Sequence, residues 1–259
     1  MKHMKKAIAL ACCFALLCLS ACSGFEGYGL EQTTAHKTHG QRYRLLPPWE
    51  PGEMRPLEIV PGEAYPLVLF LHGSSGAGTD NESQMIPGQV MGLINGALEY
   101  GEPCYIYFPQ YPSQRRSWGQ SAKTRRQVMD ALWQIVDDYP IDASRIYITG
   151  LSSGGNGAWH FLHDYPGVFA AAMPLCGWYD TGDIDYSFLM ETPLWIAHNS
   201  GDNVVDVEGS RRIARALEAL GHEDFIYTEY PEEGHNCWVD FYLTPEVWEW
   251  LFSKVKKDA

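Results

Sequence analysis

The chain has 259 residues, of which 46% are hydrophobic and 20% are charged, so it can build one sizeable globular core. Its formal net charge of −13 at pH 7 argues against a nucleic-acid partner, because contacts with phosphates depend on clusters of Lys and Arg. The same charge argues against a basic membrane-binding surface and disfavours polyanionic substrates.

The first segment has the pattern of an export signal. Three lysines precede an apolar stretch from Ala7 to Leu19, which is too short to span a bilayer. It ends in Leu-Ser-Ala-Cys at 19–22, which resembles the lipobox of bacterial lipoproteins, whose cysteine is lipidated. We therefore expect an exported protein that Cys22 anchors to the membrane of the cell envelope, at the outer membrane or the cell surface. A plain signal peptide cut near Ala21 is the alternative.

This pattern divides the chain into three parts. We expect residues 1–21 to be a lipoprotein signal peptide, 22–50 to hold a tether and a first edge strand, and 51–259 to form the main domain. Removing residues 1–21 would take three lysines and no acid, which changes the net charge from −13 to −16. Beyond Cys22 the sequence has Cys104, Cys176 and Cys237. An odd number allows either a Cys176–Cys237 disulfide or three buried thiols, and both remain open.

Continuous apolar runs, which are typical of parallel strands buried on both faces, recur along the main domain. They cover Pro66–Leu71, Tyr105–Phe108, Arg145–Thr149, Phe169–Leu175, Leu194–His198 and Phe225–Tyr230. Helical patterns lie between or after them, at Arg126–Tyr139, Gly209–Leu220 and Glu246–Lys256. Strands that alternate with helices predict an α/β fold, with a mostly parallel central sheet and helices on both faces.

A short glycine-rich turn follows the third of these runs. Residues 150–154 read Gly-Leu-Ser-Ser-Gly and fit the G-x-S-x-G nucleophile elbow, in which a strained turn between strand and helix exposes the serine. The segment Asn156–His163 follows without a proline, as a helix behind the serine requires. The pattern predicts that Ser152 is a nucleophile. A glycine-rich loop with an ordinary serine is the alternative.

Two further residues complete a candidate acyl-transfer site. Ligands of a parallel sheet bind beyond the carboxyl ends of its strands, where Asp202 follows the fifth run and His235 follows the sixth. The chain order Ser152, Asp202, His235 is that of the α/β-hydrolase triad. The imidazole takes the serine proton, and the carboxylate orients the imidazole and stabilises its charged form. No cluster has the spacing of metal ligands, so we expect neither a metal nor a cofactor.

Other residues compete for the acid and base roles. The rival acids are Asp180, Asp183, Asp185 and Asp206. The rival bases are His72, His160, His163 and His198. We expect His72 to shape the loop that binds the oxyanion, and we expect His198 to support the turn that carries Asp202. The other two histidines fall on the helix behind the serine.

The oxyanion of the reaction needs N–H donors, and the substrate needs a surface. The backbone N–H groups of Ser153 and Ser74 are the expected donors, because one follows the nucleophile and the other lies in the loop after the first buried strand. Three tryptophans fall on loops at the carboxyl edge, where they could stack on a sugar or a phenolic acyl group. They are Trp118, Trp178 and Trp238. Packing of these rings against the core is the alternative.

Short motifs spread over most of the chain point to one family. They are His72-Gly73, Asp80-Asn81, Pro109-Gln110, the elbow, Tyr165-Pro166, Cys176-Gly177, Asp202-Asn203-Val204-Val205 and Gly234-His235. Together they resemble the single-domain bacterial esterases often labelled predicted peptidases, which are similar to feruloyl esterases and polyhydroxybutyrate-depolymerase-like hydrolases. The resemblance runs from about Pro66 to Phe252. Departures such as Ser153, where methionine is frequent, leave the specificity open.

The resemblance implies an α/β-hydrolase fold. The short segment between Gly177 and Pro193, where many lipases insert a lid, predicts that a large lid is absent. The resemblance also implies a serine carboxylic-ester hydrolase that forms an acyl-enzyme, with polysaccharide esters of acetyl or feruloyl type as the expected substrates. A peptidase or amidase with the same triad is one alternative, and a surface lipoprotein that binds without turnover is another. Neither the residues nor the resemblance indicates the oligomeric state.

Overall fold

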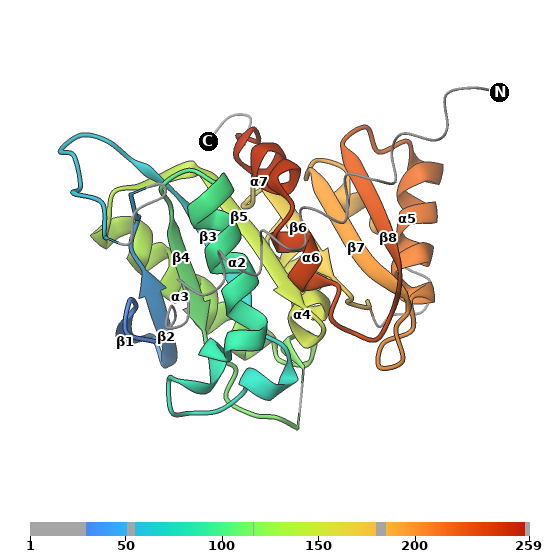
Figure 1. The fold of residues 1–259 in the computed structure, drawn as a ribbon, viewed down its shortest axis with the longest axis horizontal. Helices are drawn as coiled ribbons and strands as arrows, with labels where there is room; N and C mark the ends of the chain where they lie inside the picture. Colours follow the sequence, from blue (N-terminus) through green and yellow to red (C-terminus); the bar gives the residue numbers. More distant parts are fainter. Residues whose placement is uncertain (1–29, 51–54, 116, 180–184, 257–259) are drawn as a thin grey trace, which may run out of the picture.

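The computed structural model describes residues 30–50, 55–115, 117–179 and 185–256. A sheet of eight strands runs through the molecule in the order β1-β2-β4-β3-β5-β6-β7-β8 (Figure 1). The strands are β1 Thr34–Thr38, β2 Gln41–Leu46, β3 Tyr65–Leu71, β4 Tyr105–Pro109, β5 Ile141–Leu151, β6 Ala171–Leu175, β7 Leu194–Gly201 and β8 Phe225–Glu233. The pairs β1–β2 and β2–β4 are antiparallel, and the other five pairs of neighbouring strands are parallel. The sheet confirms the predicted α/β-hydrolase fold.

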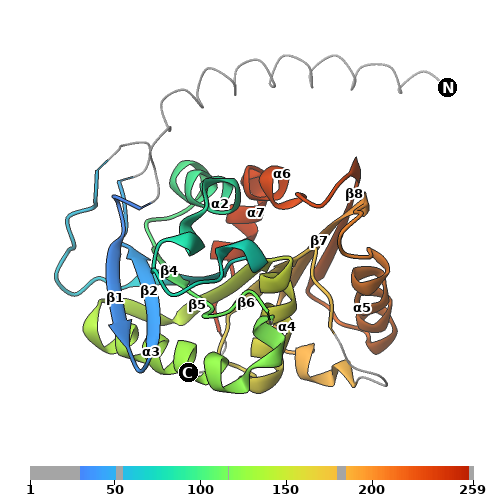
Figure 2. The ribbon, with the colours of Figure 1, turned by 90° about the horizontal axis from the view of Figure 1, so that it is seen from below.

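Helices cover both faces of the sheet, as Figure 2 shows. The helices are α2 Pro87–Tyr100, α3 Ala122–Asp138, α4 Ser153–Asp164, α5 Glu208–Leu220, α6 Trp238–Tyr242 and α7 Pro245–Phe252. Short 3₁₀ turns are η2 Ser74–Gly76, η3 Ser83–Met85, η4 Trp118–Gln120 and η5 Tyr186–Leu189. Helices α3, α4 and α5 pack on one core cluster and α2, α6 and α7 on the other. Within the described ranges, no helix is long and apolar enough to cross a membrane.

The alternation of side chains along each strand divides the core between the two faces. In β3, Leu67 and Leu69 pack with α3 and α4, whereas Val68 and Phe70 pack with α2 and α7. Both sets are fully buried, which explains why the strand reads as a continuous apolar run rather than an alternating one. The central strands are therefore positioned from both sides, and their carboxyl ends form a stable platform for the loops that follow.

One helix has no clear signal in the sequence. Helix α2 contains three glycines, which lower its intrinsic helix propensity. Gly96 packs where a side chain would overlap the carbonyl oxygen of Tyr242 and the ring of Trp248. The helix is thus stabilised by close packing on α6 and α7. This packing is a tertiary effect that local sequence patterns do not reveal.

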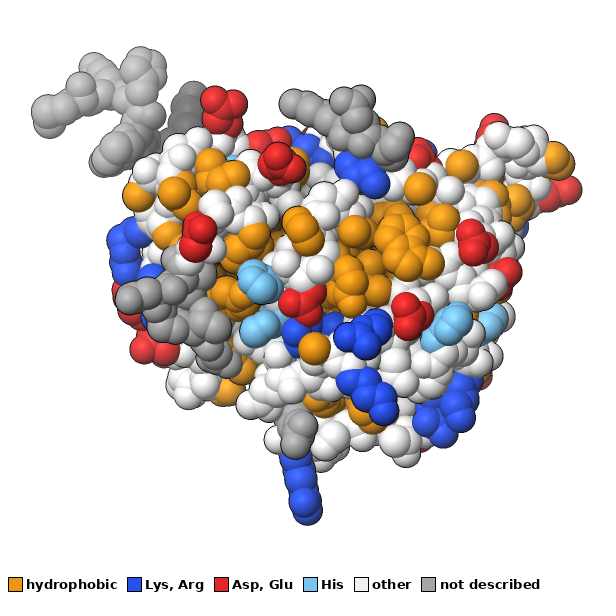
Figure 3. All heavy atoms as spheres, turned by 180° about the vertical axis from the view of Figure 1, so that it is seen from behind, with side chains coloured by type: hydrophobic (Ala, Val, Ile, Leu, Met, Phe, Trp, Pro, Cys, Tyr) orange, Lys and Arg blue, Asp and Glu red, His pale blue; other side chains and the backbone are white. Residues whose placement is uncertain are grey.

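The charges of the chain are mixed over the face seen in Figure 3, which lies opposite the one that faces the viewer in Figure 1. Acidic and basic side chains both occur there, with apolar side chains between them. The net negative charge is therefore not gathered into a single-sign patch on this face.

Candidate active site

Ser152 lies on the sharp turn between β5 and α4. Its backbone has φ 56° and ψ −118°, a conformation that L-residues rarely adopt and that marks a strained functional turn. Glycines make this turn possible. A Cβ at Gly150 would lie 2.6 Å from the carbonyl oxygen of Gly154, and a Cβ at Gly154 would overlap the carbonyl oxygen of Leu71. The turn has the geometry that the G-x-S-x-G pattern predicts.

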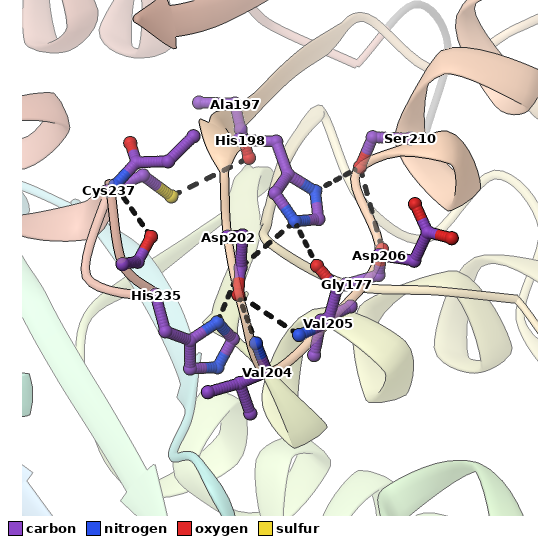
Figure 4. Close-up of polar contacts among 12 residues, drawn as sticks. Gly177, Ala197, His198, Asp202, Val204, Val205, Asp206, Ser210, His235 and Cys237 are labelled. Carbon is purple, nitrogen blue, oxygen red and sulfur yellow. Dashed lines mark hydrogen bonds and ion pairs between the residues drawn. The ribbon is translucent and has the colours of Figure 1, made fainter. Parts of the chain in front are cut away.

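Asp202 follows β7, and its side chain has no exposed surface. Its carboxylate Oδ1 accepts the backbone N–H groups of Val204 at 2.8 Å and Val205 at 3.0 Å. Its Oδ2 lies 2.6 Å from His235 Nδ1 and 3.0 Å from His198 Nε2 (Figure 4). Burial raises the pKa of Asp202, but the hydrogen bonds from His235 and the two backbone N–H groups outweigh it, so the net pKa is lowered. Asp202 is therefore an ionised acceptor.

His235 follows β8 and presents one free ring nitrogen. Because Nδ1 donates to the Asp202 carboxylate, Nε2 is the unprotonated nitrogen of the neutral ring. This Nε2 is buried and has no hydrogen-bond partner among the described residues, Ser152 included. The ring packs edge-to-face on Trp238 at 5.5 Å between centroids. The structure thus brings the predicted acid and base together and leaves the proton-accepting atom unoccupied.

The end of β6 connects the elbow with this pair. The N–H group of Ser152 donates to the carbonyl oxygen of Leu175 at 3.0 Å. The next residue, Cys176, has its sulfur within 4.8 Å of ligand atoms of both Asp202 and His235. Residues from β5, β6, β7 and the loop after β8 therefore meet at one edge of the sheet.

This cluster is the one group of close potential metal ligands in the described part of the chain. Its carboxylate already accepts four N–H groups, two from the backbone and two from imidazoles. His235 Nδ1 is itself one of those donors. The carboxylate and the Nδ1 atom are both already used in hydrogen bonds within the protein, so we assign no metal to this cluster.

The loop after β3 has the form expected of an oxyanion loop. Ser74 and Ser153 are the first residues of η2 and α4, and N–H groups at such positions have no acceptor within their own helix. The N–H of Gly73 is unavailable to a ligand, because it donates to Gln89 Oε1 at 2.8 Å. This contact, which the sequence did not indicate, excludes Gly73 as a donor and leaves the predicted N–H group of Ser74 as the candidate in this loop.

His72 has the structural role expected of it. The ring is buried, donates from Nδ1 to the carbonyl oxygen of Gly73 at 2.6 Å and accepts the N–H of Tyr111 at Nε2. Burial lowers the pKa of His72 to about 4, and the hydrogen bond to Gly73 opposes this only in part. A neutral imidazole therefore connects the oxyanion loop with the end of β4.

The prediction of an aromatic substrate rim is wrong for Trp118, which is 1% exposed. Its indole N–H donates to the carbonyl oxygen of His72 at 3.0 Å, and its ring packs edge-to-face on His72 and Tyr111. The side chain supports the oxyanion loop from within the core. Trp178 and Trp238 are half-buried at the sheet edge, as a rim residue requires.

A hollow of about 440 Å³ adjoins the turn that follows Asp202. It is lined by Trp178, Val204, Val205, Asp206, Glu208, Gly209 and Arg212. A larger hollow of about 940 Å³ lies at the opposite edge, before β6, β7 and β8, and contains none of the candidate site residues. The strained serine and the free imidazole nitrogen both lie at the carboxyl edge of the sheet, away from this larger hollow.

The rival residues have other contacts. Asp185 accepts the N–H group of Ser187 and so caps η5, and Asp206 accepts the N–H group of Glu208 at the start of α5. His198 contacts the carboxylate of Asp202, which confirms the support expected of it.

His160 and His163 lie on α4 with their rings near Tyr179. Asp180, Asp183, Cys22 and the signal region lie outside the described residues. Cys104, Cys176 and Cys237 are free buried thiols, so the second alternative for the cysteines is the one observed.

No family model matches the chain. It is 30% identical over 141 residues to poly(3-hydroxyalkanoate) depolymerase C from Paucimonas lemoignei, a match of 49% of this chain and 32% of that protein. The solved structure of a thermostable esterase matches with TM-score 0.75 and 32% identity, over 87% of this chain and 63% of that one. The chain thus spans less than two thirds of either relative.

A third likeness concerns the fold. S-formylglutathione hydrolase (FrmB) from Staphylococcus aureus matches with TM-score 0.62 and 15% identity, over 85% of this chain and 98% of that one. It has the same architecture at nearly the same length. Together with the strand order and the elbow, these likenesses show that the chain has the α/β-hydrolase fold.

Proposed function

We propose that the chain is a serine carboxylic-ester hydrolase in which Ser152, His235 and Asp202 form the catalytic triad. The observation that supports this most directly is the pairing of His235 with a buried, ionised Asp202, with Nε2 left free, at the sheet edge where Ser152 lies on a strained elbow. A neutral imidazole in this tautomer can accept a proton at Nε2 while the carboxylate holds Nδ1–H. The structural esterase relative supports the same chemistry.

The proposed reaction has two steps. Ser152 Oγ attacks the ester carbonyl, its proton moves to His235 Nε2, and the N–H groups of Ser74 and Ser153 stabilise the oxyanion. The imidazolium then protonates the leaving alcohol, and an acyl-enzyme forms on Ser152. Water, deprotonated by the same imidazole, hydrolyses the acyl-enzyme and releases the acid. The negative carboxylate of Asp202 stabilises the imidazolium in both steps.

The proposed substrates are esters that decorate polysaccharides, of acetyl or feruloyl type. The half-buried rings of Trp178 and Trp238 support this, because indole faces can stack on sugar or phenolic rings. The hollow beside Asp202 supports it further, because it is lined by both apolar and charged side chains, Trp178 among them.

The test is turnover of p-nitrophenyl acetate, p-nitrophenyl butyrate and methyl ferulate by the purified protein. We expect Ser152→Ala to lower kcat by at least about 10³-fold. The control variant is Ser253→Ala, whose exposed hydroxyl bonds to the carbonyl of Trp250 and should not affect turnover. Equal activity of wild type and Ser152→Ala on all three esters would disprove the proposal.

The same assay separates the peptidase alternative. If acyl p-nitroanilides are cleaved faster than the matching p-nitrophenyl esters, the protein is an amidase with this triad. We further propose that the protein is exported and anchored through Cys22, supported by the lipobox-like sequence at 19–22. Recovery of Cys22→Ser in the membrane fraction at wild-type levels would disprove the anchor.

A further inference from the structure

The carboxylate of Asp202 is shared between two imidazoles. His198, on β7, has no exposed surface and places Nε2 3.0 Å from Asp202 Oδ2. The same oxygen lies 2.6 Å from Nδ1 of His235. Figure 4 shows the two rings on either side of the carboxylate. The triad chemistry proposed above uses His235 alone and gives the second ring no role.

The surroundings of His198 determine where its proton lies. Nε2 is 3.0 Å from the carboxylate and 3.1 Å from the carbonyl oxygen of Val205, and both neighbours are acceptors. Nε2 therefore carries the proton. Nδ1 lies 2.8 Å from the hydroxyl of Ser210, on α5, which can donate to it. Burial is the main effect on the pKa of His198 and lowers it, so the ring is neutral.

We infer that His198 is a positioning residue for the catalytic acid, whose Nε2–H group fixes Asp202 Oδ2 and competes with His235 for it. Ser210 fixes the tautomer of His198 by its hydrogen bond to Nδ1. This inference rests on the proposed function, because it concerns the same triad. A second donor draws negative charge from the carboxylate, so Asp202 holds the imidazolium form of His235 less tightly than a carboxylate with one imidazole would.

Three titratable groups from other elements face this cluster. The Cys176 thiol, at the end of β6, stays protonated because burial raises its pKa well above the ordinary value. Glu229, on β8, stays ionised because hydrogen bonds from Arg211 lower its pKa to about 2. Cys237 lies beneath the base, where its thiol contacts the carbonyl of Ala197. Over the acid limb of an ester assay, neither Cys176 nor Glu229 therefore changes its charge.

The inference predicts a shift of the pH profile with a definite sign. Without the His198 donor, Asp202 becomes a stronger acceptor and holds the His235 imidazolium more tightly. The imidazolium is the inactive form of the base, so the acid limb of kcat/KM moves to higher pH, by about half a unit to one unit. A variant that merely displaced Asp202 would destabilise the imidazolium form of His235 and move the acid limb of kcat/KM to lower pH.

The experiment compares His198→Met with His198→Gln. The two side chains have nearly the same length and shape, but only glutamine retains an N–H donor near the position of Nε2. kcat/KM for p-nitrophenyl butyrate is measured from pH 5 to 9. We expect the methionine variant to show the upward shift and the glutamine variant to keep the wild-type limb. His163→Gln, an exposed histidine on α4, controls for histidine replacement in general.

Two results would overturn the inference: coincident acid limbs in the methionine and glutamine variants, or a downward shift in the methionine variant. If His198→Met does not fold, Ser210→Ala replaces it and should show a smaller upward shift. If the wild type hydrolyses no ester, the proposed function fails separately. Proton uptake by the His235 ring is then followed by NMR in wild type and variant, and the same upward shift is required.

Discussion

The two halves of the site are held by different kinds of contact. On the side of β3, β5 and α4, glycines let backbone segments approach so closely that Gly150 and Gly154 have no room for a Cβ. On the side of β7, β8 and α5, Asp202 is held by hydrogen bonds from two imidazoles and two backbone N–H groups. Ser152 is thus fixed by steric packing, and the Asp202–His235 pair by polar contacts.

This difference predicts two modes of failure. Steric contacts do not depend on pH, so damage to the elbow should appear as lost stability at every pH. Polar contacts depend on protonation, so damage to the acid–base half should appear first in the pH profile, as tested with His198 above. The three predictions that follow test, in turn, the steric contacts of the elbow, a titratable group buried beside it, and the ring packing against His235.

The largest effect is expected from Gly154→Ala. The added methyl group would overlap the carbonyl oxygen of Leu71, which belongs to a fully buried strand that cannot move away. We expect the free energy of unfolding to fall by about 4 kcal/mol, at the upper end of single substitutions, and esterase activity to be lost. Urea unfolding followed by circular dichroism measures this.

Gly88→Ala is the matched control for that variant. Gly88 lies in α2, and nothing is within 4 Å of a Cβ built there. The change should stabilise the helix by about 0.5–1 kcal/mol. Equal stability of the two variants would contradict the steric account of the elbow.

The second prediction concerns His72, the buried titratable group beside the elbow. The native pKa of His72 is about 4 and its ordinary value is 6.5, so the unfolded state binds more protons between those values. Stability should therefore fall as the pH drops from 6.5 to 4. The His72 contribution is about 3 kcal/mol, since one pKa unit corresponds to about 1.4 kcal/mol.

Urea unfolding of wild type and His72→Gln at pH 7 and pH 4 measures this contribution. Glutamine can accept the N–H of Tyr111 without titrating. The loss between the two pH values should therefore be smaller in the variant by about 3 kcal/mol. A loss of the same size in both proteins would show that His72 is not the group responsible. Burial also lowers the pKa of His198, so this ring causes a further loss of stability at low pH, which is common to the wild type and His72→Gln.

The smallest effect is expected from Trp238→Phe. The change removes the hydrogen bond from Nε1 to the carbonyl of Gly88 at 2.8 Å but keeps an aromatic ring against His235. We expect a loss of about 1 kcal/mol in stability, typical of one hydrogen bond, with an unchanged pH profile. Trp238→Leu, which removes the ring as well, should also lower kcat. A shifted acid limb in Trp238→Phe would show that a polar contact, not ring packing, supports the base.

Much of the site was predictable because parallel sheets place function after their strands. Asp202 and His235 could be selected because each follows a continuous apolar run, and the structure joins them by a hydrogen bond. The supporting role of His198 was also predicted and is confirmed. Ser210 was not predicted, because a serine within an amphipathic helix has no local signal for the partner that it meets across the fold.

Sequence patterns by themselves determined the six strands from β3 to β8, the elbow, and the helical pattern that stops at Leu220. The structure ends α5 there, and Gly221 follows with a φ of 73°, which suits glycine. Each of these patterns depends on a few neighbouring residues. Only the tertiary structure decided that Trp118 is buried beneath the oxyanion loop, that α2 packs as a helix despite its glycines, and that two imidazoles share one carboxylate. These features depend on contacts between distant segments, and composition and periodicity do not encode which distant side chains meet.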